Sequence, residues 1–362
     1  MEKAGLGFLS VSFMYSGAIM GAGFASGREV WQFFGVFGNF GFVGVVLAAV
    51  LFMLMGFMAS RIARTLNISD TGKVVVPGEN RFLNRFVADF MAANLFVAFV
   101  TLTAAGGAIF SQQFGLSRIL GGAIVVTLVI VTVLGGFDRV SRVSRFFVPV
   151  LMLMIVFVST ALIMQSGGIP RAESTFPASP FAGTWYLGSL LYLSYNLLVI
   201  IPIVSTASIR AKSKKHAYAG SLLGGAFLGL LSFLLLSAMI TDMDFSNAMD
   251  MPMLALSESL SPLANIVYLC ALAFAVYISA TINYYGFTVR FIRGGCRKAK
   301  IIAVALAGFA LSLVGFSYII AYVFPIIGYL GISILVMLAV NYVKITRREA
   351  KAQAHCTMEK YR

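Results

Sequence analysis

The sequence contains a succession of apolar stretches, each approaching or exceeding the roughly 20 residues that a helix needs to cross a bilayer. Hydrophobic residues make up 60% of the chain and charged residues 11%, a balance foreign to water-soluble domains. The chain is therefore predicted to be an all-α polytopic membrane protein. Its ten expected spans are 6–34, 39–60, 84–112, 117–136, 146–165, 184–206, 217–240, 262–289, 300–316 and 318–343.

The basic residues are distributed unevenly between the two sides of these spans. An even number of spans puts both termini on one side, and all 27 basic residues except Arg28, Arg118 and Arg171 then fall on that side. Cytoplasmic loops are enriched in Lys and Arg, so both termini are predicted to be cytoplasmic, in a bacterial plasma (inner) membrane. The same distribution accounts for the net charge of +14 without nucleic acid as a partner. The expected partners are the lipid bilayer and a small-molecule solute, and no oligomeric state is predicted.

The ten spans divide naturally into five plus five. We expect a first repeat over 1–165, a second over 184–343, and a basic cytoplasmic tail over 344–362. Spans one and six would then occupy equivalent positions. Two external loops are predicted: 166–182 is rich in Pro, Gly and Ser, and 241–261 carries acidic but no basic residues. The second of these loops is expected to hold a short helix at the surface.

The first span departs from a continuous apolar helix in its middle. Residues 16–29 contain four glycines, two serines and the charged pair Arg28 and Glu29. If the helix breaks there, its second half starts near Ser26. The free N–H groups and the positive end of the helix dipole would then face a mid-membrane cavity suited to an anionic group. Transporters with broken helices bind substrates in this way.

The glycines of this stretch also allow a simpler interpretation. Gly17 and Gly21, like Gly23 and Gly27, are four residues apart, a spacing that lets two membrane helices pack closely. The charges that follow favour a functional interruption, because charged side chains at this depth are costly and are usually kept for function.

Span six carries a second candidate interruption. Ser194, Tyr195 and Asn196 are polar residues near mid-membrane, and Pro202 removes a helix hydrogen bond soon after them. Interrupted spans at matching places in two halves point to a transporter's substrate site. The alternative is a proline-kinked helix in which Asn196 bonds to a neighbour.

Span eight offers hydroxyl groups for a cation. Ser279 and Thr281, followed by Asn283, place oxygen ligands where freed carbonyls of a broken helix could help them bind sodium. The alternative is that these hydroxyls bond back to their own helix, as is common in membranes.

Two carboxylates are candidates for carrying a proton. Glu29 is the better placed by depth, although Arg28 or another partner could keep it ionised. Asp89 lies in the first turns of span three, ahead of Asn94. Helical spacing also puts Asp89 close to Arg85, which makes a simple interfacial ion pair the alternative.

The sequence gives no support to an enzyme. Both histidines, His216 and His355, fall outside the spans, which excludes a His-Glu-x-x-His metalloprotease helix and an intramembrane Ser-His pair. There is no P-loop for direct use of ATP. Cys270, Cys296 and Cys356 form no disulfide framework and no metal spacing. No cofactor is expected beyond a coupling ion.

The run from Gly21 to Glu29, followed by Trp31-Gln-Phe-Phe34, resembles the YkvI-like family of bacterial membrane proteins. The specific match covers residues 15–35. The ten-span layout gives a weaker resemblance, over nearly the whole chain, to the amino acid–polyamine–organocation superfamily. Members of that superfamily share the LeuT-type fold. This resemblance implies two inverted five-helix repeats with helices 1 and 6 broken.

The resemblance also implies a substrate site and an ion site. In relatives, the glycine-rich break receives the substrate's carboxylate and amine, with a second contact region in helix six. Carried over, the substrate site falls on Gly21, Ala22, Gly23, Phe24, Ala25, Ser26, Gly27, Ser194, Tyr195 and Asn196. In sodium-coupled relatives, helix-eight hydroxyls join helix-one carbonyls, which implies Ser279 and Thr281 with the carbonyls near Gly21. Some proton-coupled relatives use a lysine in helix five, and span five here has none.

These observations predict a secondary active transporter that moves a small polar solute by alternating access. The solute is expected to be an amino acid or a related carboxylate, held at the second half of span one by its carboxylate, with Phe24 covering it. Sodium is the preferred coupling ion and a proton the second choice. The alternative functions are a non-transporting ligand-sensing receptor on the same fold, or a passive channel.

Overall fold

The computed structural model describes residues 5–78, 80–135, 138–173, 176–292 and 294–360, and for 138–147 and 351–360 the description is limited to the backbone. Some residues used above to predict orientation and cysteine pairing therefore lie outside the described residues or have no described side chain: Lys3, Arg139, Arg142, Arg145, Arg293, Lys351, His355, Cys356, Lys360 and Arg362.

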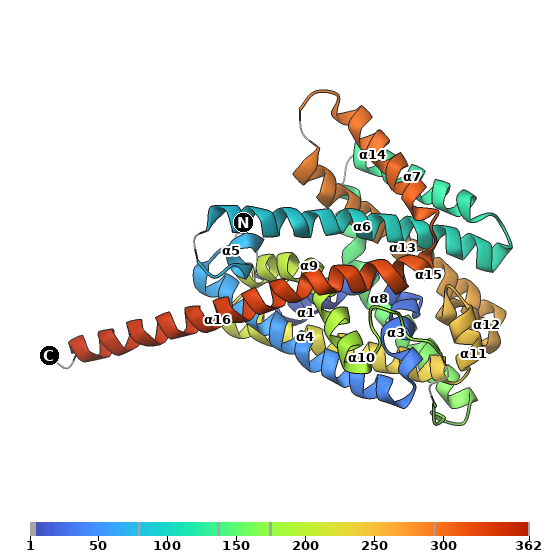
Figure 1. Cartoon of the computed structure of the whole chain (residues 1–362), viewed down its shortest axis with the longest axis horizontal. Helices are drawn as coiled ribbons and strands as arrows, with labels where there is room; N and C mark the ends of the chain where they lie inside the picture. Colours follow the sequence, from blue (N-terminus) through green and yellow to red (C-terminus); the bar gives the residue numbers. More distant parts are fainter. Residues whose placement is uncertain (1–4, 79, 136–137, 174–175, 293, 361–362) are drawn as a thin grey trace.

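The described chain folds into a bundle of helices, with one helix projecting beyond it at the C-terminal end (Figure 1). The elements are α1 (Phe8–Ile19), α2 (Ala22–Ala25), α3 (Arg28–Phe33), η1 (Gly35–Phe37), α4 (Asn39–Leu66), α5 (Thr71–Val75), α6 (Arg81–Phe114), α7 (Arg118–Gly135), α8 (Asp138–Gln165), α9 (Trp185–Ile209), α10 (Lys214–Ile240), α11 (Met243–Ala248), α12 (Pro252–Leu260), α13 (Pro262–Phe291), α14 (Arg297–Ser312), α15 (Phe316–Tyr318), η2 (Ile319–Val323) and α16 (Phe324–Lys360).

Within the described residues, eight helices are long and apolar enough to cross a membrane. They correspond to the expected spans two to eight and ten. Span ten runs through α15, the π-helical turn η2 and α16. The two remaining spans are shorter: span one is divided among α1, α2 and α3, and span nine is the 16-residue α14. The all-α polytopic membrane architecture predicted from the sequence is confirmed.

Capping residues define where several long helices begin. The side chains of Asn80, Ser213 and Ser261 accept hydrogen bonds from backbone N–H groups of the first turns of α6, α10 and α13. Pro262 follows Ser261 at the first position of α13, where a missing N–H costs nothing. At the other end of α6, Gly115 has a φ of +65°, a left-handed conformation that ends a helix.

Span one is interrupted twice. The α1 helix ends at Ile19, and the N–H of Gly21 turns back to bond to the Ile19 carbonyl at 2.6 Å. The four-residue α2 ends at Ala25, and Gly27, with a φ of +81°, separates it from α3. A Cβ atom on Gly27 would lie 2.6 Å from Sδ of Met239, so both conformation and space require glycine there. The second segment therefore starts at Ala22, four residues earlier than the expected start near Ser26.

The expected break in span six is wrong. The α9 helix is continuous from Trp185 to Ile209 with Pro202 inside it. The polar side chains form hydrogen bonds within the same helix. Ser194 Oγ and Asn196 Nδ2 donate to the carbonyls of Leu190 and Tyr192, four residues earlier. A proline removes one helix hydrogen bond, and packing on all sides of this buried helix outweighs that loss.

The long helices form two packed groups. The α1, α4, α9 and α10 helices pack on one another, and so do α6, α7, α13 and α14. The first group contains spans one, two, six and seven, and the second contains spans three, four, eight and nine. Corresponding spans of the two expected halves therefore pack together, an arrangement consistent with the division at 1–165 and 184–343, which stays a prediction.

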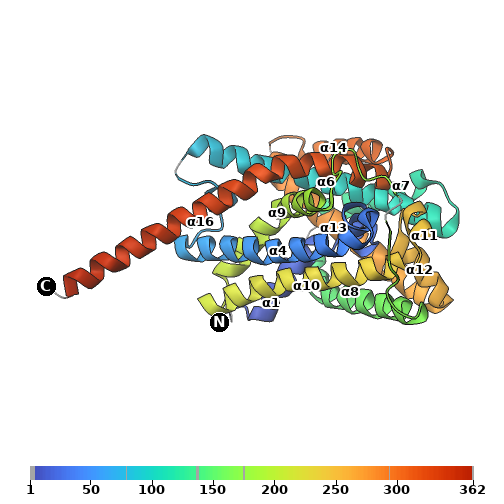
Figure 2. The same ribbon diagram turned by 60° about the horizontal axis from the view of Figure 1, so that its bottom comes forward.

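Both ends of the described chain lie at the same end of the bundle. The backbone of Leu6 pairs with Arg210 and Lys212 just after α9, and Glu349 of α16 forms an ion pair with Arg61 near the end of α4. Beyond the expected span boundary at residue 343, α16 continues as one helix to Lys360 (Figure 2). The predicted tail is thus an extension of span ten.

The acidic loop 241–261 holds short helices, as expected, and lies only partly at the surface: Asp242, Asp244 and Phe245 are exposed, whereas the segment around Met251 is buried. It contains α11 and α12, and Met251, Met253 and Leu254 in it are fully buried. The connection 247–253, which we call the strap, lies across the second half of span one. The N–H of Met253 donates to the Ser26 carbonyl at 2.9 Å, and Trp31 Nε1 donates to Asn247 Oδ1 at 3.0 Å.

Candidate functional site

An internal cavity of about 70 Å³ lies between the two groups of helices, beside the break in span one. Its volume exceeds what a single water molecule requires, and it is below the roughly 300 Å³ typical of pockets for drug-sized ligands. The lining residues are Ala18, Ile19, Gly21, Ala22, Gly23, Glu29, Asn94, Ala98, Thr101, Leu102, Tyr195, Asn196, Val199, Ser279, Asn283 and Phe324.

The cavity extends from the break toward the end of the bundle that holds both termini. On α1 the lining includes Ala18 and Ile19, which precede the break, and on α9 it continues past Tyr195 to Val199. On the opposite side, the strap covers α2 and α3. Gln112 of α6 holds the strap with two hydrogen bonds to the backbone of Met251, at 2.9 and 3.1 Å. The site is therefore closed on the side of the strap.

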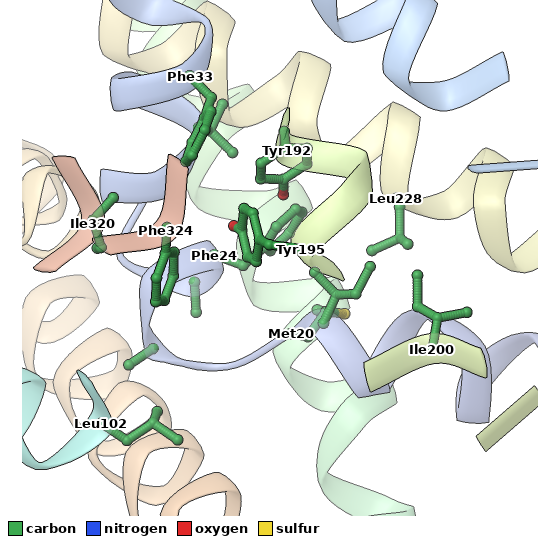
Figure 3. Close-up of a cluster of buried hydrophobic side chains, with 14 of the residues drawn as sticks. Met20, Phe24, Phe33, Leu102, Tyr192, Tyr195, Ile200, Leu228, Ile320 and Phe324 are labelled. Atoms are coloured by element: carbon green, nitrogen blue, oxygen red, sulfur yellow. The ribbon is translucent and has the colours of Figure 1, made fainter. Parts of the chain in front are cut away.

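Glu29 is the one acidic residue among the lining residues. Its side chain is 7% exposed, and its Oε2 accepts a hydrogen bond of 2.5 Å from the Tyr195 hydroxyl. Figure 3 shows Tyr195 beside Tyr192 and Phe324, whose ring centroids lie 5.7 and 4.7 Å from its own. Within the described residues Glu29 forms no ion pair. An ionised carboxylate accepts several hydrogen bonds, so this group has unused capacity for a cationic partner.

Arg28 does not neutralise its neighbour. Its Nη1 donates to the carbonyl oxygens of Asn247 and Met249 at 2.9 and 3.1 Å, so the guanidinium group lies against the strap. The expected partnership of Arg28 with Glu29 is therefore absent. The side chains of Arg28 and Glu29 point in different directions because adjacent residues of a helix are about 100° apart around its axis.

The backbone at the break offers hydrogen-bond donors to the cavity. The N–H groups of Ala22 and Gly23, in the first turn of α2, form no hydrogen bond with the described residues. The two glycines there have different surroundings. A Cβ atom on Gly21 would meet nothing closer than 3.7 Å, whereas one on Gly23 would lie 1.8 Å from Oε1 of Glu29. The Glu29 carboxylate therefore lies directly against the Gly23 backbone.

The other residues predicted for the break lie behind the cavity wall. Phe24, Ala25 and Ser26 are fully buried, and Gly27 forms the turn to α3. The Ser26 hydroxyl donates to the Gly23 carbonyl at 3.1 Å instead of pointing into the cavity. Gly17, one turn before Gly21, does allow two helices to pack closely, because a Cβ atom there would lie 2.7 Å from Val148 of α8.

On α9, the structure separates the predicted residues. Tyr195 and Asn196 line the cavity, but Ser194 faces away and packs against Gly331 of α16. The aromatic residue that covers the cavity near Tyr195 is Phe324, in place of the expected Phe24.

On α13, Ser279 and Thr281 do not share a face. Ser279 lines the cavity and its hydroxyl makes no hydrogen bond within the described chain, whereas Thr281 is fully buried and donates to the Tyr277 carbonyl at 2.8 Å. Residues two apart on a helix point roughly 200° from each other, so the pair cannot ligate one ion. Asn283, four residues after Ser279, shares its face and the cavity.

Asp89 lies away from the cavity in a partly exposed ion pair. Its carboxylate contacts Arg290 of α13 at 2.7 Å and Arg85 at 3.8 Å. The interfacial alternative therefore describes Asp89 better than a buried proton carrier. In the part of the chain that the structure describes, no group of three or more His, Cys, Asp or Glu residues could hold a metal ion.

Several lining residues were not predicted as site residues. Thr101 of α6 is one of them, although it is a polar residue within an apolar span, like Asn94 and Asn283, which were noted above beside Asp89 and Thr281. Phe324 gave no such signal, because an aromatic residue in a membrane helix is most simply a packing group. Its position follows the π-helical turn η2, which changes the face that α16 presents.

No protein-family model matches the chain. The chain is 26% identical over 343 residues to the uncharacterized membrane protein YkvI of Bacillus subtilis (strain 168), covering 92% of this chain and 96% of YkvI. The predicted resemblance to YkvI is confirmed. The chain is also 23% identical over 327 residues to the uncharacterized protein YyaD of the same strain, covering 89% of this chain and 93% of YyaD.

Solved structures identify the architecture of the chain. Mhp1 in an inward-facing conformation superimposes with a TM-score of 0.63 and 16% identity, over 94% of this chain and 77% of Mhp1. A substrate-bound, outward-open Na⁺-coupled sialic acid symporter gives a TM-score of 0.55 and 12% identity, over 93% and 79% of the two chains. The fold is the LeuT type, as expected from the resemblance.

Proposed function

We propose that the chain is a secondary active transporter that moves a small amino acid or related carboxylate by alternating access. The observation that carries this proposal is the break at Met20 and Gly21, which exposes unbonded N–H groups of Ala22 and Gly23 to an internal cavity. Helix N-termini attract anions through these groups and through the helix dipole. The solute's carboxylate would lie there, with Asn196 and Tyr195 near its other end.

The closure of the site on one side supports alternating access. The strap is bonded to Arg28, Trp31 and Gln112, while the cavity extends toward the end of the bundle with the termini. With the predicted topology, this is an inward-oriented state. Transport would require the group containing α1 and α9 to move relative to the group containing α6 and α13, which would release the strap.

The likeness of fold to the Na⁺-coupled sialic acid symporter and to Mhp1, a nucleobase-cation-symport-1 family transporter, supports ion coupling. A cation would not bind to Ser279 and Thr281 together, since these hydroxyls point in different directions. Its candidate oxygen ligands are those of Ser279 and Asn283, which line the cavity, and the Ile19 carbonyl, which lies with the Ser279 hydroxyl 3.9 Å from where a Cβ atom on Gly21 would be.

The first test is thermal unfolding of the purified protein in detergent with each standard amino acid, in sodium and in choline buffer. A solute at a hundred times its Kd stabilises a protein by about 2.7 kcal/mol, enough to raise the melting temperature measurably. Uptake of that solute into proteoliposomes then separates a transporter from a receptor, which binds without flux. Stabilisation without flux, or currents far above carrier turnover, would contradict the proposal.

A further inference from the structure

The charge of the cavity indicates which solutes it accepts. Glu29 is the one charged group among the lining residues, and Arg28 beside it is engaged by the strap. The groups that face Glu29 from the surrounding helices are neutral: Tyr195 and Tyr192 from α9, Asn94 and Thr101 from α6, Ser279 and Asn283 from α13, and Phe324 from α16. A site with one acid and no base is complementary to a cation.

The position of the carboxylate determines which part of the solute it would meet. Oε1 of Glu29 lies against the Gly23 backbone, at the same turn whose N–H groups would receive the solute's carboxylate. In an α-amino acid, the amino and carboxylate groups are attached to one carbon atom. An ammonium group held by Glu29 therefore allows the carboxylate to reach the first turn of α2, whereas an anion without an amine would be repelled by Glu29.

The chain itself gives this carboxyl group a single donor. Tyr195 provides the only hydrogen bond that the Glu29 side chain accepts within the described residues, and Glu29 is more than nine-tenths buried. A buried charge without a cation is costly, and binding a proton removes the charge. An ammonium ion and a proton would thus compete for the same oxygen atoms.

We propose that Glu29 is the receptor for the solute's ammonium group and exchanges it for a proton. This inference rests on the proposed function. On binding, the ammonium group forms an ion pair with the carboxylate, and the carboxylic acid proton leaves to solvent. When the solute departs, a proton from solvent returns to Glu29. The exchange makes the protein a proton-coupled antiporter of primary amines, with α-amino acids as the best solutes.

The test compares wild type with Glu29→Gln and, as a matched control, Asp89→Asn. Each standard amino acid is added with its decarboxylated amine and its deaminated acid, in weakly buffered detergent solution with a pH indicator. We expect binding at acid pH to release about one proton per solute, and solute affinity to strengthen by up to about tenfold per pH unit wherever that release is complete. E29Q should release no proton and lose amine affinity tenfold or more, whereas D89N should retain both properties.

Three results would overturn the inference. These are binding without proton release in wild type, a deaminated acid that binds as well as the amino acid, and unchanged amine affinity in a folded E29Q protein. If no solute of the panel binds, the proposed function fails for this panel, and an infrared pH titration of the wild type decides about Glu29. A carboxylic acid band that appears on acidification and is missing in E29Q supports the proton site, and its absence from the wild type contradicts it.

Discussion

The Tyr195 hydroxyl of α9 donates a hydrogen bond of 2.5 Å to the Glu29 carboxylate of α3, across 166 positions of sequence. This contact joins span one to span six, the two spans predicted to hold the solute. It also joins the one acid among the cavity-lining residues to a neutral donor.

Removing this donor should shift the pH dependence of binding. Tyr195→Phe keeps the ring that packs against Phe324 but deletes the hydroxyl. The variant removes the one hydrogen bond that the Glu29 side chain accepts within the described chain. We expect amine binding, measured by thermal shift across pH, to follow a different pH profile from the wild type. An unchanged profile in a folded Y195F protein would contradict the coupling of these residues.

The two glycines at the break should respond differently to alanine. In Gly23→Ala the new Cβ atom would lie 1.8 Å from Oε1 of Glu29, so the carboxylate must move. We expect a loss of about 1–3 kcal/mol of stability from overpacking and complete loss of uptake. Gly21→Ala meets nothing closer than 3.7 Å and should unfold at the wild-type temperature while binding solute more weakly. Normal uptake by G23A at normal expression would refute the placement of the site.

Alanine variants of two nearby residues on α9 should distinguish a residue that binds the solute from one that only packs. Both side chains bond back to their own helix, but Asn196 also lines the cavity, whereas Ser194 packs against Gly331 of α16. Asn196→Ala is expected to weaken solute affinity by roughly threefold to tenfold, the value of one hydrogen bond. Ser194→Ala should leave it within twofold. Equal effects of both variants on the concentration dependence of uptake would argue against the cavity as the binding site.

A similar comparison on α13 tests the oxygen ligands. Ser279 presents a hydroxyl to the cavity, and Thr281 uses its own to bond to Tyr277. If sodium contributes to binding, the sodium dependence of the thermal shift should be lost in Ser279→Ala and retained in Thr281→Ala. Loss in T281A alone would place the ion elsewhere.

The strap should loosen without Arg28. Arg28→Met removes hydrogen bonds from a charged donor to the carbonyls of Asn247 and Met249, each worth about 1.5–3 kcal/mol. We expect faster amide hydrogen exchange over 247–253 and a lower melting temperature. Arg171, which is exposed in the loop after α8, provides the control: Arg171→Met should change neither. Unaltered exchange in R28M would mean that the guanidinium group does not hold the strap.

Much of the architecture could be predicted from local sequence. Apolar runs of about 20 residues impose membrane helices wherever they occur, because lipid offers the backbone no hydrogen-bond partners. The glycines between Met20 and Arg28 likewise indicated an interruption, although its start lies at Ala22 rather than near Ser26. The separation of Ser279 from Thr281 was available from helical geometry alone, since residues two apart on a helix do not share a face.

The sequence by itself determined that this chain spans a membrane many times, where most spans lie, and that span one is interrupted beside a charged pair. The tertiary structure decided which residue of that pair lines the cavity. Arg28 is held by the strap 219 positions away, while Glu29 meets Tyr195. It also decided that α9 stays continuous and that Phe324 covers the site. These outcomes depend on contacts between distant segments, whereas local patterns report only the preferences of one helix at a time.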